Sequence, residues 1–167
     1  MGVGGKLLVA LPAIVEDSFR RTVVLVLEHT PETAYGVVIN RPTNVPLAVA
    51  LPRWDDRAAA PAVVFQGGPV EQDSAIALGR VGDTVTPVDL EGDPALLGAD
   101  VRVFAGYAGW SAGQLDDELV RGAWAVCDAE PGDAFRPDAE DLWYTVLARQ
   151  PEPLRHLSML PDDLSVN

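Results

Sequence analysis

The stretch TVVLVLEH (22–29) constrains the fold most, because it is almost continuously apolar and rich in β-branched residues. Such a run is typical of a central β-strand that is covered on both faces. The turn sequence PETAYG (31–36) follows it, and YGVVIN (35–40) supplies a partner strand. The sequence therefore predicts a β-hairpin over residues 22–40 in the middle of a sheet.

The rest of the chain contains more strand than helix, which predicts an α+β fold. The helix predicted over 112–122 ends at Gly122, a residue type common just after a helix. The sequence predicts one or two helical turns over residues 46–51 and a mobile loop over residues 53–62. The strongest expected helix is 137–150. Strand 62–68 should run into a Gly-Gly-Pro turn, and 84–90 should be an edge strand because of its proline. The other expected strands are 6–10, 74–81, 101–107 and 123–129.

Composition limits the classes of function. The 167 residues predict a single domain over 1–167, with 48% apolar residues to fill a core. All of the net charge of −13 falls on residues 51–167, a distribution that disfavours direct binding of nucleic acid. The one cysteine, Cys127, lies in an apolar run and predicts a buried, inert thiol in a reducing, cytoplasmic setting. No run reaches 18 apolar residues, so we expect no membrane span.

GWSAG (109–113) reads G-x-S-x-G, the pattern of a serine hydrolase nucleophile elbow. A strand before it, a helix after it, and His156 with Asp128, Asp133 or Asp138 downstream are compatible with a catalytic triad led by Ser111. Ser111 and Gln114 also have the S-x-x-Q spacing of a helix capping box, which explains the serine without chemistry. We favour the cap, in which the Ser111 hydroxyl accepts a hydrogen bond from the amide of Gly113 or Gln114.

Other polar positions have a structural and a functional interpretation. His29 lies at the end of its strand, and a structural role with its hydrogen-bonding groups satisfied within the protein is favoured over contact with a ligand. Asn40 and Arg41 suit a turn better than an anion site. Gly67 and Gly68 lack the G-K-[ST] of a phosphate loop, which favours a tight turn. Trp110 and Trp124 flank a predicted helix and should be buried with their indole N–H groups satisfied.

Four segments together are similar to the YqgE/AlgH family: GKLLVALPAIVEDSFRRTVVLVLEH, YGVVINRP, VFQGGPV and FAGYAGWSAGQLDDELVRGAW. The resemblance covers roughly residues 5–147. It implies an α+β fold, a compact mixed sheet with a small closed β-barrel-like core flanked by helices, in a cytosolic protein. It implies no established biochemical activity, and it does not reserve the position of Ser111 for serine.

The sequence thus favours a non-enzymatic protein that binds a small ligand or a partner protein and has a possible regulatory role. We expect no cofactor or metal, and a monomer or weak homodimer. The alternative is a serine hydrolase that uses Ser111 and His156. The candidate ligand or partner face lies where three turns could converge, and consists of Asn40, Arg41, Gln66, Gly67, Gly68, Trp110, Ser111 and Gln114.

Overall fold

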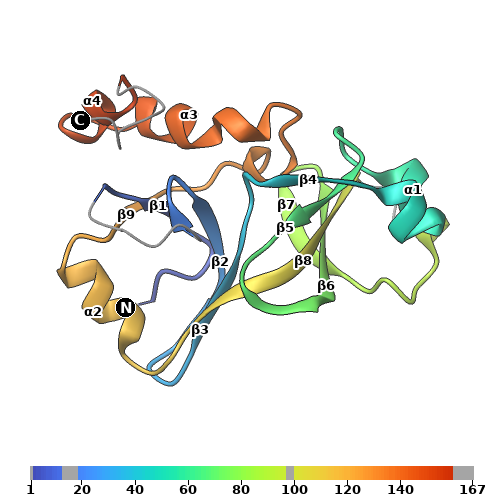
Figure 1. Cartoon of the computed structure of the whole chain (residues 1–167), viewed down its shortest axis with the longest axis horizontal. Helices are drawn as coiled ribbons and strands as arrows, with labels where there is room; N and C mark the ends of the chain where they lie inside the picture. Colours follow the sequence, from blue (N-terminus) through green and yellow to red (C-terminus); the bar gives the residue numbers. More distant parts are fainter. Residues whose placement is uncertain (1, 13–18, 97–99, 160–167) are drawn as a thin grey trace.

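A computed structural model describes residues 2–12, 19–96 and 100–159 (Figure 1). The strands are β1 (Leu7–Ala10), β2 (Val23–His29), β3 (Ala34–Val38), β4 (Pro42–Pro46), β5 (Val63–Gln66), β6 (Val70–Val81), β7 (Thr84–Val88), β8 (Asp100–Trp110) and β9 (Trp124–Cys127). The α-helices are α1 (Leu47–Ala50), α2 (Gln114–Val120), α3 (Leu142–Ala148) and α4 (Leu154–Leu157). Short 3₁₀ helices are η2 (Pro52–Arg57), η3 (Pro94–Leu96), η4 (Asp133–Phe135) and η5 (Ala139–Asp141). The expected α+β class is confirmed.

Strand β8 joins two parts of one mixed sheet. Its first half pairs with β6 on one side and β5 on the other, and its last residues pair with β3. Gly106, with a φ of +74°, lies between the two halves, and a Cβ atom there would come within 2.5 Å of the Gly68 carbonyl oxygen. A glycine is therefore required where the strand passes from one part of the sheet to the other.

The expected closed β-barrel is wrong. The strand order is β4-β5-β8-β3-β2-β1-β9, with the β6–β7 hairpin joined at β8, and the terminal strands β4 and β9 do not pair with each other. The sheet stays open because it splits at β8 into two diverging parts (Figure 1). We call them the first sheet (β9-β1-β2-β3) and the second sheet (β4-β5-β8-β6-β7).

The hairpin at residues 22–40 is confirmed as β2 and β3, an antiparallel pair in the middle of the whole strand order and part of the first sheet. Both faces of this sheet are covered, which accounts for the continuous apolar run. Leu7, Val9 and Leu25 pack in the core that includes α3, whereas Leu8 and Val24 pack with Trp110, Trp124 and Leu115 of α2.

Three local predictions differ from the structure. The expected mobile loop 53–62 contains η2, where Trp54 is buried and donates its indole N–H to the Leu90 carbonyl at 3.0 Å. The expected helix 137–150 is divided into η5 and α3. Strand β8 runs through Trp110, beyond the expected end at 107, because its last residues find a partner in β3.

Candidate functional site

The turn at GWSAG is held by hydrogen bonds among its own side chains. Gln114 Oε1 accepts hydrogen bonds from the Ser111 backbone N–H at 3.0 Å and from the Ser111 hydroxyl at 3.2 Å. Helix α2 begins at Gln114, and the residue before it, Gly113, is left-handed and offers no side-chain cap. The expected cap is thus wrong in direction, because the Ser111 hydroxyl donates to the Gln114 side chain and does not accept from a backbone amide. Of the capping box, the structure contains only the bond in which the Gln114 side chain accepts the Ser111 backbone N–H.

Ser111 and His156 are not brought together. His156 lies in α4, which packs on one face of the first sheet, whereas α2 packs on the opposite face (Figure 1). Within the described parts of the chain, no hydrogen bond joins the two residues, and the Ser111 hydroxyl is engaged with Gln114. The geometry therefore does not place His156, the base of the hydrolase hypothesis, next to Ser111.

Two of the three expected turns meet. The Gln66 backbone N–H donates to the Arg41 carbonyl at 2.8 Å, and Gly67 packs against Gly106 of β8. Asn40 is buried and bonds Val23 and Arg21, so it joins the start of β2 to the end of β3. The third turn, 109–114, lies at the other end of β3 from residues 40–42 (Figure 1). The second turn comes nearer to it, because Gly68 lies against the Tyr107–Ala108 backbone that leads into GWSAG.

Trp110 and Trp124 are buried, as predicted, and both indole N–H groups reach a carboxylate. Glu118 Oε1 accepts them at 3.0 and 2.8 Å, and Glu118 Oε2 accepts a hydrogen bond from Gln114. His29 is also structural: its Nδ1 accepts the Val3 N–H, and its Nε2 lies 3.4 Å from an Asp116 oxygen. The polar side chains of this motif are therefore occupied in holding α2 and the N-terminal segment to the sheet.

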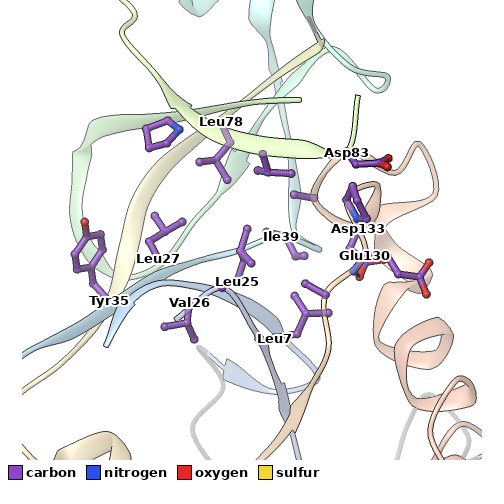
Figure 2. Close-up of a pocket in the computed structure, with 16 residues that line it drawn as sticks. Leu7, Leu25, Val26, Leu27, Tyr35, Ile39, Leu78, Asp83, Glu130 and Asp133 are labelled. Carbon is purple, nitrogen blue, oxygen red and sulfur yellow. Dashed lines mark hydrogen bonds between the residues drawn. The ribbon is translucent and has the colours of Figure 1, made fainter. Parts of the chain in front are cut away.

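The sequence did not reveal a cavity of about 390 Å³ that lies between the two sheets. We call it the inter-sheet cavity. Leu25 and Leu27 of β2, with Ile39 directly after β3, face Leu78 of β6 across it (Figure 2). Val85 and Pro87 of β7 and the segment 129–134 close its sides. These residues look like ordinary core positions in the sequence, and only the divergence of the sheets leaves a space between them.

The two ends of the inter-sheet cavity differ in chemistry. Tyr35 lies at one end, and Asp83, Glu130 and Asp133 lie at the other, which we call the acidic end (Figure 2). The described residues that line the cavity include no lysine or arginine. Such a site has an apolar middle with a few polar groups at its ends, the usual composition of a small-molecule site.

The half-buried Arg149 and the buried Arg102 hold the wall at the acidic end. Arg149 bonds both oxygens of Asp133 at 3.2 and 2.9 Å and lies 2.5 Å from a Glu130 oxygen. Burial disfavours its charge, but these carboxylates outweigh that effect and raise the pKa of Arg149. Arg102 is 2% exposed, and burial lowers its pKa to about 10. Its guanidinium group donates hydrogen bonds to the backbone carbonyls of Ala59, Ala60, Ala134 and Arg136. The cavity wall is thus fixed to β8 and α3.

The AlgH-like family model, DUF179, matches residues 7–155. The chain belongs to the AlgH-like family. Similar proteins include a UPF0301 protein of Streptomyces avermitilis, 47% identical over 98% of this chain and 94% of that protein, and one of Rhodococcus jostii, 41% identical over 98% and 90%. The YqgE/AlgH resemblance is confirmed.

Two solved structures resemble this AlgH-like chain. The crystal structure of DIP2367 from Corynebacterium diphtheriae has a TM-score of 0.87 at 31% identity, covering 94% of this chain and 92% of that one. The solution structure of AlgH from Pseudomonas aeruginosa has a TM-score of 0.68 at 30% identity, covering 98% and 96%. In the described part of the AlgH-like chain, no helix has the length and hydrophobicity of a membrane span.

Proposed function

We propose that this AlgH-like chain is a non-enzymatic binding protein for a small, mostly apolar molecule, and that the inter-sheet cavity is its site. The observation that carries the proposal is the cavity itself. Its volume of about 390 Å³ falls in the range of small-molecule pockets, and it is lined by apolar side chains from both sheets. The polar side chains of the GWSAG turn, in contrast, already satisfy one another.

The charge of the acidic end favours a ligand whose polar group is neutral or cationic. Glu130 and Asp133 share Arg149, but Asp83 has no hydrogen bond or ion pair with another residue in the described ranges. A carboxylate or phosphate placed there would be repelled by these groups and by the net charge of −13. An ammonium group would be attracted.

The test uses three probes with one apolar body and different charges: 3-phenylpropan-1-ol, 3-phenylpropylamine and 3-phenylpropionate, titrated by calorimetry. We expect the amine to bind about five- to thirtyfold more tightly than the propionate, the ratio produced by an attraction and a repulsion of about 0.5–1 kcal/mol each. Asp83→Asn should lower this ratio of amine affinity to propionate affinity. The matched control, Asp73→Asn, removes an exposed charge from β6 away from the cavity and should leave it unchanged.

The outcomes separate two parts of the proposal. If none of the probes binds, the inter-sheet cavity is not a site for small apolar molecules. If the propionate binds as tightly as the amine, the cavity is a site but the acidic end does not select its ligand. If the order is as expected but Asp83→Asn leaves the ratio unchanged, the selection comes from another group.

A further inference from the structure

A second hollow adjoins the inter-sheet cavity. It has a volume of about 420 Å³ and is lined by Tyr35, Val70, Ile76 and Tyr107, with residues 33–34 and 109–110. We call it the tyrosine groove. Tyr35 lines both spaces, so its side chain is part of the wall that separates them.

Strand β6 continues from one space into the other. Leu78 lines the inter-sheet cavity, and Ile76 lines the tyrosine groove. Residues two apart in a strand lie on the same face, so one apolar face of β6 forms a wall of both spaces. Figure 2 shows Tyr35 at the end of the cavity beyond Leu27, away from the acidic end.

The two tyrosines of the groove are held differently. The Tyr107 hydroxyl is hydrogen-bonded to Glu71, which raises the pKa of Tyr107. Tyr35 is half-buried, and among the described residues its hydroxyl has no hydrogen-bond partner; its ring packs edge-to-face against Tyr107 at 6.1 Å between centroids. Turning the Tyr35 side chain therefore breaks one aromatic contact and no hydrogen bond to these residues.

We propose that Tyr35 is a movable partition, and that the cavity and the groove together bind one elongated apolar chain that passes it. This inference rests on the proposed function of the cavity and adds the shape of the ligand. The cavity alone is near the lower limit of small-molecule sites, whereas the two spaces joined lie well within their range.

The test uses uncharged n-alkanols from butanol to dodecanol, which makes the result independent of the acidic end. The chain has three isoleucines, Ile14, Ile39 and Ile76. Ile39 lines the cavity and Ile76 the groove, so a sample labelled only at isoleucine methyl groups reports on each space by NMR. Short alcohols should shift the Ile39 signal alone, and long ones should shift both.

Affinity should rise about fourfold per methylene throughout the series, as each added group is buried. Ile76→Phe fills part of the groove, so affinity should stop rising beyond alcohols of intermediate length, whereas the affinity for short alcohols should stay unchanged. Val81→Phe, at an exposed position of the same strand, should behave as wild type. Tyr35→Phe, which keeps the ring, should also keep the full length dependence.

Two results would overturn the inference. In one, alcohols of all lengths shift Ile39 but never Ile76, and Ile76→Phe has no effect, which leaves the cavity as a site and removes the groove from it. In the other, no alcohol shifts either methyl signal, which contradicts the proposed function as well.

Discussion

Trp110 and Trp124 donate their indole N–H groups to the same oxygen of Glu118, and their rings pack edge-to-face at 5.9 Å between centroids. One lies at the end of β8 and the other at the start of β9, so Glu118 joins α2 to both strands that flank it. The residues between the tryptophans thus form a structural unit built around one half-buried carboxylate.

Glu118→Ala should lower the free energy of unfolding by about 2–4 kcal/mol, because it leaves two buried N–H donors without an acceptor. Glu118→Gln should cost less, since its amide oxygen still accepts. Urea denaturation measures both, with Asp117→Ala, an exposed neighbour on the same helix, as the control. A Glu118→Ala protein as stable as this control would mean that the carboxylate does not hold the tryptophans.

Ser111→Ala should change the free energy of unfolding by less than about 0.5 kcal/mol, because its hydroxyl contacts only the exposed Gln114 side chain. A loss of about 1 kcal/mol is typical of a true side-chain cap and would restore that interpretation. We also expect no labelling of Ser111 by a fluorophosphonate probe. Stoichiometric labelling that His156→Ala abolishes would establish the alternative, a serine hydrolase.

Arg102→Ala should lower the free energy of unfolding by about 3–5 kcal/mol, since four carbonyl oxygens lose their donor in a buried place. Arg121→Ala, at the exposed position directly after α2, is the matched control and should cost less than about 0.5 kcal/mol. Thermal unfolding followed by circular dichroism compares the two. Equal melting temperatures would show that the 59–60 and 134–136 segments are held without Arg102.

Cys127 should react slowly with a thiol reagent in the folded protein. Its side chain is buried in β9, and burial raises the pKa of the thiol, so little reactive thiolate forms near pH 8. Absorbance with Ellman's reagent should show full reaction only after addition of denaturant. Rapid reaction of the native protein would indicate that β9 opens readily.

Sequence patterns predicted the hairpin β2–β3, the short helix at 47–50, the edge strand β7 and the burial of both tryptophans, because each depends on neighbours in the chain. The division of 137–150 and the folding of 53–62 depend on distant contacts, such as Trp54 with Leu90. The open sheet follows from the partners that β8 finds on each side. The inter-sheet cavity was least predictable, because Leu25, Ile39 and Leu78 have the same pattern as filled core positions.

The proposed function requires that the inter-sheet cavity is a ligand site, and Leu27→Trp tests this most directly. Leu27 points into the cavity (Figure 2), so an indole there should occupy it and weaken 3-phenylpropylamine binding by at least about tenfold in calorimetry. Val120→Trp, at a position 87% exposed on α2, adds the same side chain outside the cavity and should bind as wild type. If a folded Leu27→Trp protein binds the amine as tightly as Val120→Trp does, the inter-sheet cavity is not where the ligand binds.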